Sequence, residues 1–413
     1  MNWGDDPSAG GGPLAGVRVL DLTAVLMGPF ATQLLGDMGA DVIKVESPTG
    51  DTSRGIGPMR NPGMGPGFIK TNRNKRGIVL DLKSEAGREA LLRLVKTADV
   101  LVYNIRPAAM KRLRLGWDDL ASINPRLIHA GVFGYDQEGP YADWPAYDDL
   151  IQGAAGVPSL LARITDGTPR YAPLVFVDRA VGASAVNAIT AALYQRERTG
   201  RGQSLEIPMF ETILPFVMGE HMAGATFDPP LGPYGYSRLL APDRRPYATQ
   251  DGYVCALLYT DAHWKRFYEM TGRADQHASD ERVKNISART QYMSELCADN
   301  ARFFATDTTA SWMQRLKDAD IPCMQLNSPE TLMQDPHLQA TQYFQRVQHP
   351  SEGAHWQMRP AARSSEAPRA QMLHAPRKGQ HTRDVLAQAG YSDEEIETLI
   401  VSGAAQAEPP QSH

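Results

Sequence analysis

The 413-residue chain is long enough for two domains, and its hydrophobic content of 42% and charged content of 22% are ordinary for a globular protein. A formal net charge of -5 argues against nucleic acid or an anionic membrane as a partner. No apolar run approaches the roughly 20 residues that a membrane span needs. Three scattered cysteines without paired spacing, together with an acidic, glycine-rich start, predict a cytoplasmic protein.

The first half of the chain alternates between strand and helix patterns. Apolar runs predict buried strands at residues 17–22, 41–46, 78–82, 99–103 and 127–133. Between them, helical patterns occupy residues 30–38, 84–97 and 107–122. This alternation is typical of a Rossmann-like α/β fold, an open parallel sheet with helices on both faces. Ligands of such sheets bind beyond the carboxyl ends of the strands, so the loops at those ends are candidate sites.

The turn after the first strand is one such candidate site, where a dinucleotide could bind. Glu46 ends the second strand, where an acid could hold a ribose. The turn itself has only Gly28, where a dinucleotide site needs the pattern G-x-G-x-x-G. The sequence therefore argues against NAD.

Basic residues gather in two of the candidate loops. The first basic group is Arg73, Lys75 and Arg76, and the second basic group is Arg106, Lys111, Arg112 and Arg114. Such runs are usually solvated surface. Both groups nevertheless adjoin strand ends, where a phosphate-rich cofactor would need Arg and Lys. Asn104, also at a strand end, is either a turn residue or part of that site.

Asp178 follows the apolar run 174–177 and precedes a helix that we expect to end at Gly200. The expected strand 203–207 comes next. These patterns place Asp178 where a short extended segment meets a helix N-terminus. One interpretation is an N-cap. The other is a nucleophile that the helix N-terminus keeps ionised.

Several segments carry a family resemblance. GVRVLDLTAVLMGPFATQLLGDMGADVIKVESPTGD, NRNKRGIVLDLK, ADVLVYNIRPAAMKRLRLGW, NPRLIHAGVFGY and RERTGRGQSLEIPMFE follow one another in this order, and DRRPYATQDGYVC, DPHLQATQYF and LHAPRKGQHTRDVLAQAGYSDEEI come later. Over nearly all of residues 14–403 the chain resembles the class III (family III) CoA-transferases. That group contains formyl-CoA transferase and carnitine CoA-transferase, with alpha-methylacyl-CoA racemase as a relative. The resemblance implies an enzyme that uses acyl-CoA and a carboxylic acid and needs no metal.

The resemblance also assigns site residues. Asp178 would attack the acyl-CoA thioester and then carry CoA as an aspartyl thioester. The residues that match the family's contacts to coenzyme A and the reacting centre are Leu26, Met27, Asn74, Lys75, Asn104, Arg112 and Tyr147.

Two departures from the family pattern bear on the substrate and the reaction. Leu26 replaces the glutamine of formyl-CoA transferase-like sequences, which argues against a short oxalate- or formate-like substrate. Tyr147, before Asp148, replaces the racemase histidine, which favours transfer over racemisation. A racemase or isomerase, and a non-catalytic CoA-binding protein, remain alternatives.

Composition shifts suggest the domain organisation. We expect a large domain over 14–224, a smaller α/β domain over 225–330, a return to the large domain over 331–403, and disordered tails at 1–13 and 404–413. The resemblance implies an interlocked homodimer. It also implies a glycine loop over the aspartate, for which Gly232 and Gly235 are candidates, although both also read as plain turn glycines. Thr382 is expected to cap one late helix, and a capping box from Ser392 to Glu395 another.

Overall fold

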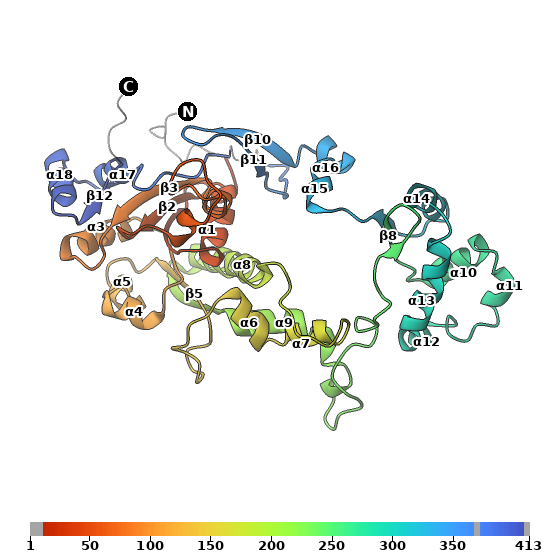
Figure 1. Ribbon diagram of the computed structural model, residues 1–413. Coiled ribbons are helices and arrows are strands. Elements are labelled where there is room, and N and C mark those ends of the chain that lie inside the picture. The colour runs from red at the N-terminus through yellow and green to blue at the C-terminus, as the bar shows by residue number, and fades with distance from the viewer. Residues whose placement is uncertain (1–10, 367–371, 409–413) are drawn as a thin grey trace. The chain divides into compact units, whose positions relative to one another are not determined.

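The computed structural model describes residues 11–366 and 372–408 (Figure 1). The chain divides into two compact units. Unit 1 comprises Met1–Ala155, Pro173–Leu214 and Gln342–His413, and unit 2 comprises Gly156–Ala172 and Pro215–Thr341. Residues 225–330, which we expected to form the smaller domain, lie inside unit 2.

Unit 1 is built on a seven-stranded sheet with the order β12-β3-β2-β1-β4-β5-β6. Its strands are β1 (Arg18–Leu22), β2 (Asp41–Glu46), β3 (Lys75–Leu80), β4 (Val100–Tyr103), β5 (Ile128–Phe133), β6 (Gln203–Pro208) and β12 (Ala405–Gln406). All neighbouring pairs are parallel except β12 with β3. The predicted parallel sheet is confirmed, and β1 to β5 lie within two or three residues of the expected ranges at each end.

Alternation along the buried strands assigns each face of the sheet a different environment. Leu20, Ile43, Ile78 and Leu101 point to an apolar core. That core packs against helices α3 (Glu85–Val95), α17 (Thr382–Gln388) and α18 (Asp393–Val401), which Figure 1 shows gathered together. On the other face lie α1 (Met27–Asp37) and α8 (Phe176–Thr199), which pack against each other.

The smaller helices of unit 1 are α2 (Pro66–Thr71), α4 (Pro107–Arg112), α5 (Trp117–Ala121) and α6 (Asp148–Ala154). A hairpin of β10 (Phe344–His349) and β11 (Gly353–Met358) also belongs to this unit. Helix α1 begins three residues before the expected start at residue 30.

Several predicted helix ends are confirmed. The Ser84 hydroxyl accepts the Gly87 N–H at the start of α3, and Gly200 ends α8 at φ +73°. Ser392 and Glu395 form the expected capping box of α18.

Two expectations near the C-terminus are wrong. Thr382 is the first residue of α17 rather than its cap, because its hydroxyl donates to the Gln406 carbonyl at 2.7 Å and accepts the Val79 N–H at 3.2 Å. These bonds help to tie β12 to β3. Ala405 and Gln406, expected in a disordered tail, therefore extend the sheet. Of the other residues expected to be disordered, 11–13 are described, whereas 1–10 and 409–413 lie outside the described residues.

Unit 2 combines a three-stranded sheet with short helices. Its strands are β7 (Tyr247–Ala248), β8 (Tyr253–Ala256) and β9 (Cys323–Gln325). The helices around its core are α10 (Asp261–Met270), α11 (Ala274–His277), α12 (Ile286–Gln291), α13 (Met293–Phe304) and α14 (Thr309–Asp318). The remaining elements of unit 2 are α7 (Val157–Ala162), α15 (Pro329–Leu332), α16 (Pro336–Ala340) and η3 (Ala223–Thr226). Helix α9 (Met209–His221) contains Pro215, the residue at which the second segment of unit 2 begins.

Aromatic side chains fill the core of unit 2, among them Trp264, Phe267, Phe304 and Trp312. The smaller domain was expected to be α/β, and its strands lie outside residues 261–320, which contain helices and no strand. Within the described residues no helix is long and apolar enough to cross a membrane.

Candidate active site

Asp178 lies inside the first turn of α8, not at its N-cap. The helix begins at Phe176, and Val175 occupies the N-cap position without a side-chain hydrogen bond. Both the expected extended segment at 174–177 and the N-cap interpretation are therefore wrong. The reason is that Val177 is fully buried and continues the helical apolar stripe of Val181.

Asp148 holds the backbone of Asp178 in place. One Asp148 carboxylate oxygen accepts the Asp178 N–H at 3.0 Å, and the other accepts the Gln152 side-chain amide at 2.6 Å. Gln152 also donates to the Leu174 carbonyl at 3.1 Å. Asp148 thus satisfies a first-turn N–H of α8 from a distant helix. Tyr147, its neighbour, is 65% exposed at the N-cap of α6.

The charge environment of Asp178 differs from the expected one. Burial, followed by the nearby Asp148 carboxylate, raises the pKa of Asp178 to about 6, and Arg179 opposes this shift. The sequence had suggested that the helix N-terminus would keep the group ionised. No Lys, Arg or His of the described residues forms an ion pair with Asp178, since the Arg179 guanidinium lies over the Phe30 ring, 4.4 Å from its centroid. Asp178 is still mostly ionised at pH 7.

Helix α8 brings this aspartate close to the loop after β1. Gly182 lies one helical turn beyond Asp178, on the same face. A Cβ atom at Gly182 would sit 2.8 Å from the Met27 carbonyl oxygen and 3.1 Å from the Phe30 ring. Only glycine allows this approach. The predicted contact residues Leu26, which is partly exposed, and Met27, which is buried, therefore lie beside the Asp178 face of α8.

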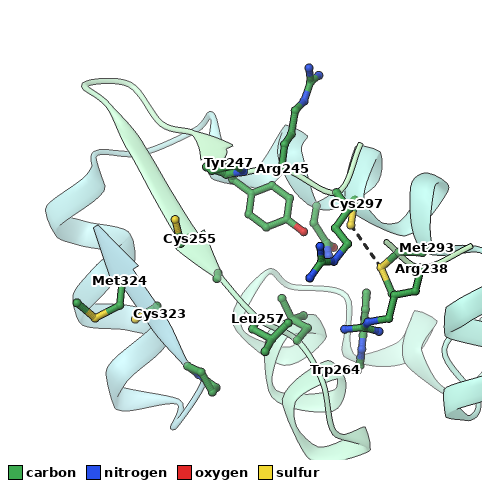
Figure 2. Close-up of a pocket in the computed structure, with 16 residues that line it drawn as sticks. Arg238, Arg245, Tyr247, Cys255, Leu257, Trp264, Met293, Cys297, Cys323 and Met324 are labelled. Carbon is green, nitrogen blue, oxygen red and sulfur yellow. Dashed lines mark hydrogen bonds between the residues drawn. The ribbon is translucent and has the colours of Figure 1, made fainter. Parts of the chain in front are cut away.

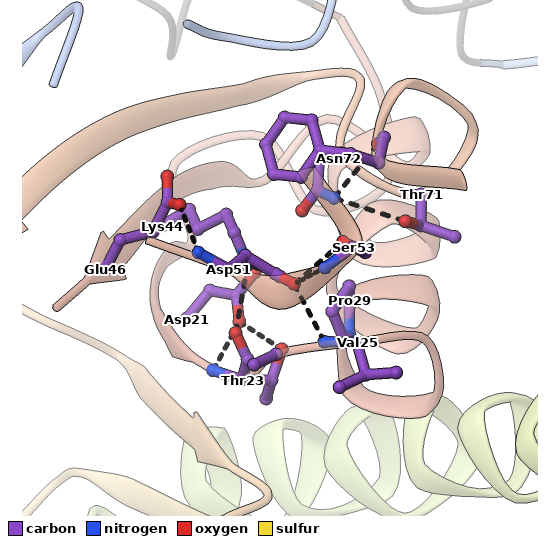
Figure 3. Close-up of polar contacts among 12 residues, drawn as sticks. Asp21, Thr23, Val25, Pro29, Lys44, Glu46, Asp51, Ser53, Thr71 and Asn72 are labelled. Carbon is purple, nitrogen blue, oxygen red and sulfur yellow. Dashed lines mark hydrogen bonds and ion pairs between the residues drawn. The ribbon is translucent and has the colours of Figure 1, made fainter. Parts of the chain in front are cut away.

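The loop itself is fixed by side chains from other elements. The Asn104 amide accepts the Ala24 N–H at 2.9 Å and donates to the Ala24 carbonyl at 2.8 Å. Asp51 accepts the N–H of Val25, which has φ +72°, a conformation that β-branched residues rarely adopt (Figure 3). Asn104 therefore positions this loop, and its amide has contacts on both of its polar atoms.

Charged groups buried beneath the loop support it. The Lys44 ammonium donates to the Thr23 carbonyl and to Asp51, both at 2.9 Å, as Figure 3 shows. Asp51 also accepts from the Ser53 hydroxyl at 2.7 Å. Glu46, once considered for a ribose, forms two hydrogen bonds with Arg54 at 2.7 Å. The acid at the end of β2 is thus paired within the fold.

Lys75 belongs to the same buried network. Its ammonium donates to Asp21 at 2.9 Å, to the Pro29 carbonyl at 2.8 Å and to the Asn72 amide oxygen at 2.8 Å. Because the side chain is fully buried, the pKa of Lys75 is lowered to about 8. All three ammonium hydrogens have acceptors, which leaves none for a phosphate. The predicted contact of Lys75 with CoA therefore has no support in this fold.

The rest of the first basic group is also paired internally. Arg73 donates twice to Asp37 and Arg76 donates twice to Asp41, at 2.6 to 2.9 Å. The buried Asn74 amide likewise donates to Asp37 at 2.8 Å, and its oxygen accepts the Leu373 N–H at 2.7 Å. Asn74, another predicted CoA contact, is committed to the fold.

The second basic group is on the surface. All four of its residues are exposed, and none forms an ion pair with a carboxylate of the described residues. Arg112 lies in the last turn of α4, and Arg106 donates to the Asp143 carbonyl at 3.3 Å. These cations are free to meet a phosphate.

A cavity of about 310 Å³ lies at the carboxyl ends of β1, β2 and β3. Its lining includes Ile105 and Leu113, whose chain neighbours Arg106, Arg112 and Arg114 belong to the second basic group. Lys83 also lines it and was missed in the sequence. Its position directly after the strand predicted at 78–82 was the signal that could have identified it.

Other sequence candidates lie in unit 2 or carry no ligand set. Gly232 and Gly235 belong to unit 2, and Gly235 has φ +111°, which requires glycine. Closure of their loop over Asp178 stays a prediction. The described residues contain no group of three or more His, Cys, Asp or Glu side chains placed to hold a metal ion.

Comparison with known proteins identifies the family of the chain. The sequence model described as CoA-transferase family III matches residues 14–382. The formyl-CoA:oxalate CoA-transferase of Streptomyces avermitilis is 32% identical over 94% of this chain and 98% of its own length. The succinate–glutarate CoA-transferase of Agrobacterium fabrum is 33% identical over 79% of this chain and 83% of its own length.

A solved structure shows the same fold. The crystal structure of Rv3272 from Mycobacterium tuberculosis superimposes with a TM-score of 0.78 at 29% identity, covering 91% of this chain and 99% of that protein. The chain therefore belongs to CoA-transferase family III, a family of transferases.

Proposed function

We propose that this protein moves CoA from an acyl-CoA thioester to a carboxylic acid, with Asp178 as a covalent nucleophile. The observation that carries the proposal is the state of Asp178. It is a partly buried carboxylate without an ion-pair partner among the described residues, and its backbone is held by Asp148. It also lies one helical turn before Gly182, which packs against the Met27 carbonyl. An acid in such a place is available for chemistry rather than for stabilising the fold.

The first half of the reaction loads CoA onto the enzyme. The ionised Asp178 carboxylate attacks the thioester carbonyl carbon, the carbon–sulfur bond breaks, and CoA leaves as a thiolate. The product is a mixed anhydride of Asp178 and the acyl group. The thiolate then attacks the Asp178 carbonyl of that anhydride, which releases the donor acid as its carboxylate and leaves an aspartyl–CoA thioester.

The second half runs the same chemistry in reverse with another acid. The acceptor carboxylate attacks the aspartyl thioester, forms a second anhydride and again expels the CoA thiolate. The thiolate attacks the acceptor's acyl carbon, which yields the new acyl-CoA and regenerates the Asp178 carboxylate. The cycle consumes no proton, so the reaction requires only that the Asp178 carboxylate is ionised. Because the pKa of Asp178 is about 6, the carboxylate is mostly ionised above pH 6.

Cofactor binding is proposed at the sheet edge. We assign the nucleotide end of coenzyme A to the cavity at the ends of β1 to β3, and its phosphates to Arg106, Arg112 and Arg114. Lys83 adds a further exposed cation at the cavity wall. The thiol arm would then pass the loop at Leu26 and Met27 toward Asp178, with Tyr147 near the reacting centre.

We also propose a homodimer, on the family resemblance alone. If the two chains are interlocked, dilution should not produce monomers, because separation would require unfolding. Light scattering across a wide concentration range tests this, and a monodisperse monomer would contradict it.

The function is tested by offering the purified protein a panel of acyl-CoA donors and carboxylate acceptors and reading the products by mass spectrometry. A new acyl-CoA that requires both substrates supports transfer. The same panel in deuterated water separates transfer from racemisation of a 2-methylacyl-CoA. Because Tyr147 replaces the racemase histidine, the α-proton should stay in place, and deuterium entering that carbon at a catalytic rate would overturn the transferase assignment.

A further inference from the structure

A second cavity, of about 380 Å³, lies entirely within unit 2 (Figure 2). This volume is within the range of small-molecule sites. Apolar side chains such as Leu257, Leu258 and Met293 form much of its wall. Three arginines, Arg238, Arg244 and Arg245, line it as well, whereas no Asp or Glu of the described residues does. The cavity is therefore positively charged and largely apolar.

Arg238 is the most unusual of these residues. It is only 7% exposed, yet it forms no ion pair or hydrogen bond with its side chain among the described residues. Its guanidinium carbon lies 5.3 Å from the centroid of the Tyr259 ring. Burying a guanidinium without an anion is unfavourable. An anion in the cavity would supply the missing partner.

Other groups converge on the same space. Burial raises the pKa of the Cys297 thiol. A hydrogen bond with Tyr247 and then the charges of Arg244 and Arg238 oppose this rise, while Asp243 adds to it, so both arginine charges act near Cys297. The buried indole N–H of Trp264 has no acceptor among the described residues. Figure 2 shows Arg238 and Trp264 on the side of Cys297, with Arg245 projecting away. The cavity thus offers two cations and an unused donor.

We propose that this cavity binds the carboxylate of a small organic acid, with Arg238 as its main partner. A guanidinium matches a carboxylate through two parallel hydrogen bonds. The apolar walls would bury the hydrocarbon part of such an acid, which inorganic phosphate lacks. The site rests on residues of unit 2 alone, so it stands whether or not Asp178 proves to be a nucleophile.

The test is calorimetric titration of the full-length protein with straight-chain monocarboxylates and dicarboxylates and, separately, with inorganic phosphate. Arg238→Gln should weaken acid binding by about tenfold or more, the scale of a charge-assisted hydrogen bond. Arg245→Gln is the matched control, because Arg245 is exposed and already lies 4.0 Å from Asp243. It should stay within about twofold of wild type.

Two further variants keep the test decisive. Arg244 is exposed, so Arg244→Gln should fold even if the buried Arg238→Gln does not, and it should also weaken binding. Asp178→Ala should bind the acid as wild type does, which separates this site from the proposed nucleophile. The proposal is overturned if no acid binds, if the Arg238 and Arg244 variants bind normally, if phosphate binds as tightly as the acids, or if Asp178→Ala abolishes binding.

Discussion

The first basic group lies inside unit 1, and the second lies on its surface. Lys75 and Arg76 are buried against Asp21 and Asp41, which their cations neutralise. Arg112 and its neighbours are exposed and have no carboxylate partner among the described residues. The difference separates two uses of charge. Pairing inside the fold fixes the loop near Asp178, whereas an unpaired charge at the surface can bind an anion.

The same contrast holds for carboxylates. Lys75 and Lys44, with the Thr23 and Thr32 hydroxyls, hold the pKa of Asp21 below its usual value although burial acts to raise it. Asp178 lacks an ion-pair partner, and burial with the neighbouring Asp148 raises its pKa to about 6. Paired groups therefore serve the structure, and unpaired groups are the candidates for function.

Breaking an internal pair should give the largest effect. Lys75→Met removes the ion pair of the buried Asp21 carboxylate and leaves it only the nearby Lys44 charge and its threonine hydrogen bonds. Breaking a buried pair typically costs about 3–5 kcal/mol. Denaturant unfolding should show this loss. Arg112→Met, in the exposed group, should change the free energy of unfolding by less than about 0.5 kcal/mol. Adding Asp21→Asn to Lys75→Met should restore part of the stability, and equal losses in Lys75→Met and Arg112→Met would refute the comparison.

Removing an exposed cation should affect binding instead. Arg112→Ala should weaken CoA binding by about tenfold, the scale of one charge-assisted contact, and should make it less dependent on salt. Calorimetry at two ionic strengths measures both effects. Arg126→Ala is the control, because this exposed arginine precedes β5, at the amino ends of the strands. Unchanged CoA affinity in the Arg112 variant would remove the second basic group from the cofactor site.

Activity should depend on the ionisation of Asp178. With a pKa of about 6, kcat/KM should fall as pH drops through 6, because only the ionised carboxylate attacks. Asp148→Asn removes the neighbouring negative charge, so the fall of kcat/KM on the acidic side of the pH profile should move to lower pH. An unchanged pH profile in that variant would show that Asp148 does not set the pKa of Asp178.

The smallest effect concerns stability. The pKa of Asp178 is raised in the folded state from 3.8 to about 6, so its stabilising contribution is full below pH 3.8 and is lost as pH rises through 6. Asp178→Asn cannot ionise and should be more stable than wild type above pH 6, by about 1 kcal/mol after solvent screening. The difference should vanish near pH 4. Denaturation midpoints at pH 8 and pH 4 measure this difference. An Asp178→Asn variant that is less stable than wild type at pH 8 would contradict the prediction.

Much of the fold of unit 1 could be predicted because local patterns encode it. Strands buried on both faces of a parallel sheet read as continuous apolar runs, which is why β1 to β5 were found. The start of α8 was misplaced because Leu174 and Val175 extend the apolar run without joining the helix. The strand β12 was missed since two residues give no periodic pattern.

The site was less predictable because its contacts are distant in sequence. Lys75 and Asp21 are 54 residues apart, so nothing local distinguishes Lys75 from a surface lysine such as Lys111. Asp178 and Asp148 are 30 residues apart, and the role of Asp148 in fixing the α8 backbone had no sequence signal. Asp178 itself was identified through the family resemblance, since its position alone favoured a helix cap.

The central claim is that Asp178 carries the transferred groups covalently, and peptide mass spectrometry tests it most directly. Wild-type protein mixed with a donor acyl-CoA and no acceptor should carry a hydroxylamine-sensitive adduct on the peptide that contains Asp178. Asp178→Ala should carry none, should still bind CoA, and should lose several orders of magnitude in transfer rate. An adduct on another peptide, or an alanine variant that keeps a tenth of the rate, would contradict the account.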